Sequence, residues 1–99
     1  MRTDLKVFTQ FLKAQSFLNN YTPADMVVTS EKEIEIVKEM LNLESMGVEE
    51  LNMMRDFIVL YYEHVRKGIP REDSRWFKYL NSMMSVTTVI DLVIDKKEK

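Results

Sequence analysis

Apolar side chains recur along most of this chain at the spacing of one face of an α-helix. In residues 4–18 they cover about half of a helical wheel, and Thr3 stands where a helix N-cap belongs. The apolar members of this segment are Leu5, Val7, Phe8, Phe11, Leu12, Ala14 and Leu18. Asn19 and Asn20 follow them, so we predict a first helix over 4–18.

The stretch TPAD, residues 22–25, contains two signals for a helix start. Thr22 is a suitable N-cap, and Pro23 fits the first helical position because its fixed φ suits a helix and its missing N–H is not needed there. We therefore predict one or two helical turns over residues 23–28.

A second helix is predicted to start at the stretch SEKE, residues 30–33. Ser30 and Glu33 have the spacing of a capping box, in which each side chain bonds the other residue's backbone amide. The apolar positions continue at helical spacing through Met46, and Gly47 is the expected stop.

Residues 48–67 have apolar side chains over more than half of the wheel, which predicts a helix at the centre of a bundle. Gly68 stands where a left-handed C-cap belongs, and Pro70 prevents the helix from continuing. This segment should therefore end in a turn that leads into another helix.

The last helix is predicted over residues 71–95, followed by a frayed tail at 96–99. An alternative remains for residues 86–94, whose β-branched side chains are also typical of a strand. A strand needs a partner, and the only other β-like stretch is the very short 26–29. We therefore favour a helix.

These segments predict a single all-α domain over residues 1–99. We expect a small antiparallel bundle, four-helix-bundle-like, with three long helices plus one short helix; the minor alternative is an α+β fold with a C-terminal strand. The composition agrees, since 45% of the residues are hydrophobic, 30% are charged, and there are only two glycines and two prolines.

Charge and composition exclude several classes of protein. A net charge of −2 gives no overall attraction to nucleic acid or anionic lipid, and the absence of cysteine excludes disulfides and thiolate chemistry. No apolar run is long enough to be a transmembrane helix or a signal peptide. We expect no membrane association and a cytoplasmic location.

We find no set of residues that predicts an enzyme. The only histidine, His64, falls at the edge of the apolar face of its helix, and the glutamates at 31, 35 and 39 form a solvated stripe. Two glycines cannot supply a phosphate-binding loop, and the spacing of donors matches no metal motif. We expect no catalytic residue, metal, cofactor or small-molecule substrate.

Nucleic-acid binding is the alternative function. Arg71, Arg75 and Lys78 recur about one turn apart near Trp76 and Tyr79, and basic side chains beside aromatic rings can hold phosphates and stack on bases. Residues 39–58 also look like a helix-turn-helix, which would suit a transcription-regulatory protein. Their acidic character favours an ordinary helix hairpin instead.

The favoured function is protein binding through the first helix. Its apolar arc is wider than the stripe of roughly 100° that a surface helix needs, and Phe17 lies outside that arc. We predict that Phe17, Tyr21, Gln10 and Lys13 contact a partner, which is a second copy or another protein. The competing interpretation is that Phe17 packs under the turn at 19–23 as part of the core.

The general composition resembles that of small accessory proteins of viruses and mobile elements. The resemblance lies in the size, the absence of cysteine, the eight methionines and the helical pattern, and it involves no particular residue. It implies a protein that acts by binding a host or viral protein, in the host cytoplasm if viral.

Overall fold

The computed structural model describes residues 3–21 and 30–99. In this part of the chain the fold is all-α, as predicted, and contains no strand. The elements in order are α1 (Thr3–Asn20), α2 (Glu31–Leu41), the short 3-10 helix η1 (Leu43–Ser45), α3 (Val48–Lys67) and α4 (Ser74–Glu98). The helical turn predicted over 23–28 lies outside the described residues.

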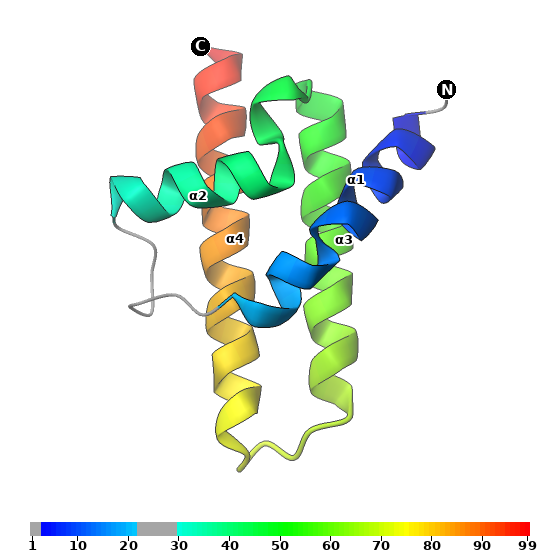
Figure 1. Cartoon of the computed structure of the whole chain (residues 1–99), viewed down its shortest axis with the longest axis vertical. Coiled ribbons are helices and arrows are strands. Elements are labelled where there is room, and N and C mark those ends of the chain that lie inside the picture. The colour runs from blue at the N-terminus through cyan, green and yellow to red at the C-terminus, as the bar shows by residue number, and fades with distance from the viewer. Residues whose placement is uncertain (1–2, 22–29) are drawn as a thin grey trace.

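The longest helices, α3 and α4, form an antiparallel pair, and α1 and α2 lie across one side of it (Figure 1). α1 crosses α3, whereas α2 crosses α4 and contacts α1. The fold is thus a small helical bundle in which only one pair of helices is aligned along its length.

The core lies where these two layers meet. It contains fully buried side chains from every α-helix: Val7, Leu18, Val37, Leu41, Leu51, Met54, Ile58, Tyr62, Val86, Val89 and Ile90. α3 packs against both α1 and α4, as its wide apolar arc predicts. The β-branched residues of 86–94 lie within α4, where several of them supply the buried face, so the strand alternative is wrong.

The second helix ends five residues earlier than the sequence pattern predicts. α2 stops at Leu41 because Asn42 adopts a left-handed conformation, with φ of 55°, and its amide bonds the Glu39 carbonyl at 3.1 Å. Asparagine tolerates this conformation better than most residues. Gly47 has an ordinary extended conformation, with φ of −77°, and is the N-cap of α3 instead.

Two predicted caps are also different in the structure. Ser30 is the N-cap of α2, but its side chain makes no capping hydrogen bond. A carboxylate reaches back at the start of α3 instead, where the Gly47 amide donates to Glu50 Oε1 at 3.3 Å. Gly68 follows α3 as predicted, but its φ of −88° is not left-handed.

α4 begins at Ser74, three residues later than expected, because Asp73 is its N-cap. The Asp73 carboxylate accepts a hydrogen bond from the Arg75 amide at 2.9 Å, a typical N-cap interaction. The helix continues to Glu98, and Lys97 Nζ donates to the Glu44 carbonyl of η1 at 3.2 Å. Residues 96–98 are therefore helical where a frayed tail was expected.

Candidate protein-binding surfaces

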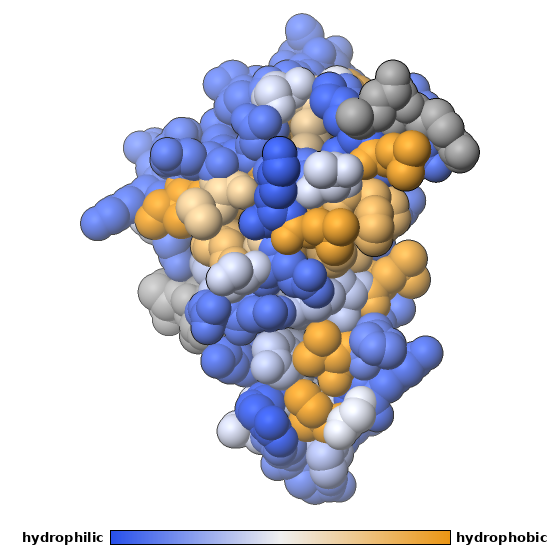
Figure 2. Space-filling view, turned by 45° about the vertical axis from the view of Figure 1, so that its right-hand side comes forward, coloured by the Kyte–Doolittle hydropathy of each residue, from blue (hydrophilic) through white to orange (hydrophobic). Residues whose placement is uncertain are grey.

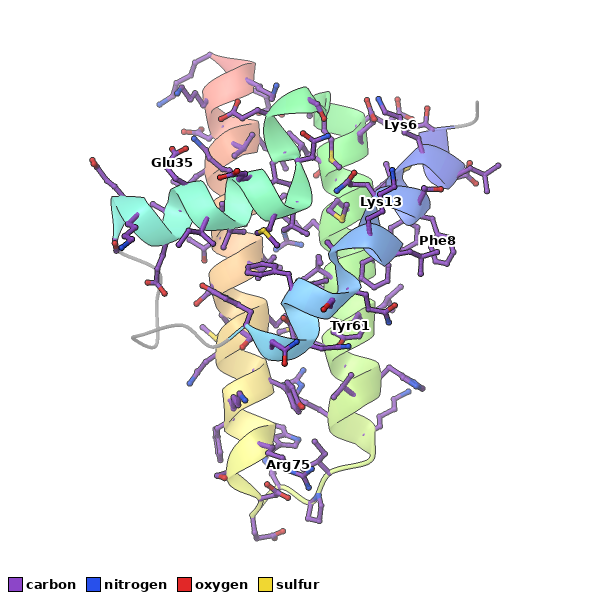
Figure 3. All side chains as sticks on the ribbon, in the orientation of Figure 1. Lys6, Phe8, Lys13, Glu35, Tyr61 and Arg75 are labelled. Carbon is purple, nitrogen blue, oxygen red and sulfur yellow. The ribbon has the colours of Figure 1, made fainter. Side chains whose placement is uncertain are left out.

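α1 has two exposed sides, which differ in character. Its buried face consists of Val7, Phe11, Ala14 and Leu18. Figure 3 shows Lys13 on the side of α1 toward α2 and Phe8 on the opposite side. The first side belongs to a groove between α1 and α2, and the second belongs to an apolar surface shared with α3.

The groove, which we call the α1–α2 groove, contains all four residues predicted to bind a protein. Its larger part has a volume of about 540 Å³ and is lined by Lys13, Ser16, Phe17, Asn20, Tyr21, Glu33, Ile36 and Met40. A hollow of about 250 Å³ adjoins it and is lined by Lys6, Thr9, Gln10, Lys13, Asn42, Ser45 and Met46. Lys13 belongs to both parts.

Phe17 and Tyr21 form the wall of the groove on the α1 side. Their rings are 5.1 Å apart, and both side chains are partly buried against the core. The Tyr21 carbonyl accepts a hydrogen bond from Ser82 Oγ of α4 at 3.1 Å. Both residues are therefore held in place by the fold while part of each side chain faces the groove.

Tyr21 also carries its hydroxyl into a buried polar spot. Burial raises the pKa of Tyr21, the nearby Glu33 carboxylate raises it further, and the hydroxyl of Ser85, which is fully buried, acts in the opposite direction. The Tyr21 and Ser85 hydroxyl oxygens are both buried, and neither makes a hydrogen bond in the described part of the chain.

The exposed apolar part of the groove comes from α2, which the sequence analysis did not assign to the site. Ile36 is 42% exposed and Met40 is 46% exposed, although both lie on the apolar face of their helix. They are one turn apart and so present a continuous apolar edge. The sequence contained one signal for these two residues: the apolar face of α2 is wider than the core needs.

On the opposite side of α1, Leu5, Phe8 and Leu12 are 51%, 43% and 49% exposed. Their spacing of three and four residues places them on one line. Leu60 of α3 is 61% exposed, and the rings of Phe8 and Phe57 lie 5.7 Å apart across the two helices. We call Leu5, Phe8, Leu12 and Leu60 the α1–α3 band.

Figure 2 shows this side of the molecule, on which apolar side chains gather in patches among hydrophilic ones. Large apolar side chains are also exposed on α4, at Phe77, Met84 and Leu92. These are about two turns apart and do not form a continuous line, whereas the three members of the band on α1 are separated by only one turn.

Ion pairs connect α1 and α2 to their neighbours near these surfaces. Lys6 Nζ lies 2.8 Å from Glu50 Oε2 of α3, and this contact lowers the pKa of Glu50. Lys38 Nζ lies 3.0 Å from Glu44 Oε1 of η1, which lowers the pKa of Glu44 and raises that of Lys38. Both pairs are partly exposed, so we expect each to contribute little to stability.

The predicted nucleic-acid patch lies at the α3–α4 turn, where Figure 3 labels Arg75. Arg75 makes a close ion pair with Asp73, with Nη2 and Oδ2 2.7 Å apart, and the Arg75 side chain followed by its amide lowers the pKa of Asp73 to about 2. The Arg71 guanidinium stacks on Trp76 at 5.0 Å from the ring centre. Lys78 is exposed.

His64 and the glutamates of α2, the other candidates from the sequence, do not come together in one site. His64 is exposed, not packed at the edge of the core as the sequence suggested. The stripe of glutamates on α2 is exposed, as predicted, and Glu35 pairs with Lys38 at 3.3 Å. In residues 3–21 and 30–99, no group of three histidine or acidic side chains is arranged to hold a metal ion.

None of the helices described is long and apolar enough to cross a membrane. Comparisons with protein-family models, curated proteins and solved structures found no match to this chain.

Proposed function

We propose that this chain is a non-enzymatic protein-interaction module that binds an apolar segment of a partner protein in the α1–α2 groove. The observation that supports the proposal most is the convergence of Gln10, Lys13, Phe17 and Tyr21 with the exposed edge of α2 in one groove. A hollow between two helices suits a helical or extended peptide, which can lay its apolar face into it.

The composition of the groove resembles that of a protein interface. Ile36 and Met40 leave apolar surface in water that a partner would bury, and methionine adapts to partners of different shape. Lys13, Ser16 and Asn20 place polar groups around the apolar part, as the rim of an interface does. Because Phe17 and Tyr21 are already fixed by packing, binding would cost little side-chain entropy at these positions.

Nucleic-acid binding through Arg71, Arg75 and Lys78 remains the alternative, and the geometry supports it less. The Asp73 carboxylate neutralises Arg75, and Arg71 lies against Trp76, so a phosphate would have to compete with both contacts. Three phosphate contacts would in any case give weak binding with a shallow dependence on salt. A role as an accessory protein of a virus or mobile element rests on composition alone.

The proposal is tested by placing a charge in the groove. Met40→Lys puts an ammonium group at the groove edge, and Met84→Lys makes the same change on α4 at a side chain of equal exposure, 46% against 45%. Each tagged protein is used to capture partners from its native cells, followed by quantitative mass spectrometry. We expect a partner that the wild type and Met84→Lys capture and that Met40→Lys loses by tenfold or more.

Light scattering on the same three proteins shows whether the partner is a second copy. Self-association that Met40→Lys abolishes and Met84→Lys preserves would support the groove as a homodimer interface. The proposal would be contradicted if both variants captured the same partners and had the same molar mass.

A further inference from the structure

The α1–α3 band is a second unpartnered surface, separate from the groove, and its surroundings are negatively charged. Glu49, Asp56 and Glu63 are exposed and recur every seven residues along α3, so they form one row. Leu60 is one turn from both Asp56 and Glu63 and therefore lies beside this row. None of the three carboxylates makes an ion pair within the described part of the chain.

Among residues 3–20, the α1 side of the band carries no cation that would balance this row. The residues one turn from Leu12 are Thr9, Gln15 and Ser16, all uncharged, and Asp4 is one turn from Phe8. Lys6 and Lys13 are on the other side of the helix, where both line the hollow beside α2. On α3, His64 follows Leu60 by one turn, and the exposed Lys67 follows Glu63 by one turn at the end of the acidic row.

The size of the band indicates what kind of contact it can make. With about 200 Å² for a fully exposed large apolar side chain, its four members present on the order of 400 Å². A standard interface buries roughly 800 Å² on each partner, so the band alone is about half of what a stable dimer needs. It matches one helix, about 10 Å wide, that also contacts the charged row.

We propose that the α1–α3 band binds a basic amphipathic helix of another protein. The apolar face of that helix lies on Leu5, Phe8, Leu12 and Leu60, and its lysine or arginine side chains lie against the carboxylates one turn from Leu60, Asp56 and Glu63. A second copy of this chain suits the band less well, because in the described part of the chain the three carboxylates beside the band outnumber the one lysine, Lys67, that lies one turn from Glu63.

The probe is a synthetic helix of three heptads with leucine at its apolar positions and lysine at one flanking position of each heptad. A control peptide has glutamate in place of these lysines. Fluorescence anisotropy of the labelled peptides gives Kd for the full chain at low and physiological salt. We expect the lysine peptide to bind at least tenfold more tightly than the glutamate peptide, and to weaken as salt screens the charges.

Matched variants locate the contact. Leu12→Ser should weaken binding of the lysine peptide tenfold or more, whereas Leu92→Ser, the same change at a leucine of α4 with nearly equal exposure, should not change Kd. The double variant Asp56→Lys, Glu63→Lys should abolish binding of the lysine peptide. Its control is the double variant Glu31→Lys, Glu39→Lys, which makes the same change of charge on exposed residues of α2 and should retain most of the binding. Circular dichroism confirms that each variant is folded.

Three results would overturn this proposal: equal affinity for the two peptides, equal effects of the matched variants, or a wild-type dimer that Leu12→Ser dissociates. The last of these would identify a second copy as the occupant. Because Met40→Lys leaves the band intact and Leu12→Ser leaves the groove intact, failure at one surface does not decide the other.

Discussion

At the C-terminal end of α1, hydroxyl groups of other helices donate hydrogen bonds to backbone carbonyls, as backbone amides do inside a helix. The carbonyl of Leu18, among the last four of the helix, receives a hydrogen bond from Tyr62 Oη of α3 at 3.2 Å, and Ser82 of α4 bonds the Tyr21 carbonyl. Helix ends leave such carbonyls without an intrahelical partner. These contacts connect the groove wall to both long helices.

The Tyr62 hydroxyl gives a prediction at this scale. Tyr62→Phe removes the hydroxyl that donates to the Leu18 carbonyl and leaves this carbonyl without that donor in a buried site. We therefore expect the free energy of unfolding to fall by about 1 kcal/mol. Tyr61→Phe is the control, because the Tyr61 side chain is only partly buried and makes no hydrogen bond in the described part of the chain. Urea unfolding measures both, and equal losses would contradict the assigned role of Tyr62.

Among the elements, helix type was predictable from sequence and helix ends were less so. Residues 48–67 form α3 at the predicted bounds because a wide apolar arc and a following glycine and proline agree with each other. The end of α2 was missed because Asn42, in a left-handed conformation, ends the helix before it reaches Gly47, the expected stop. Either residue can end a helix, and only the backbone distinguishes them.

The two helix-end candidates can be separated by matched substitutions. Asn42→Ala forces a residue with a Cβ and no compensating polar group into φ of 55°, and we expect it to lower the free energy of unfolding by about 1 kcal/mol. Gly47→Ala should change the free energy of unfolding little, because φ is ordinary and the new Cβ would meet only Glu50 Oε1 at 3.8 Å. The lower entropy of the unfolded chain offsets the poorer N-cap that alanine makes. Thermal unfolding that ranks the two variants in the opposite order would contradict this account.

For the molecule as a whole, the class of fold was predictable and the direction of each helix face was not. Seven apolar residues define the arc of α1, and a helical wheel cannot say which part of so wide an arc meets the core. That choice depends on how α1 crosses α3, and the crossing buries Val7 and Phe11 while it leaves Phe8 and Leu12 in solvent. Gln10, Lys13 and Phe17 lie outside the arc altogether, so their side of α1 was predictable, whereas Ile36 and Met40 lie on the apolar face of α2 and were missed.

The same crossing predicts that neighbouring phenylalanines on α1 have different roles. Phe11 is 7% exposed and its ring lies 6.0 Å from Phe57 and 5.7 Å from Tyr61, whereas Phe8 is 43% exposed. Phe11→Ala should cost about 3–5 kcal/mol, a large part of the stability of a domain of this size. Phe8→Ala should cost about 1 kcal/mol, because only part of its ring leaves water on folding.

Urea unfolding of Phe8→Ala and Phe11→Ala, with peptide binding measured on the folded fraction, separates stability from recognition. We expect Phe8→Ala to remain folded and to lose affinity for the basic helix, since its ring belongs to the surface that the helix covers. Phe11→Ala should show the large loss of stability and, where folded, a smaller loss of affinity. If Phe8→Ala unfolds the protein as strongly as Phe11→Ala, then the exposed line on α1 is part of the core and the band is not a free surface.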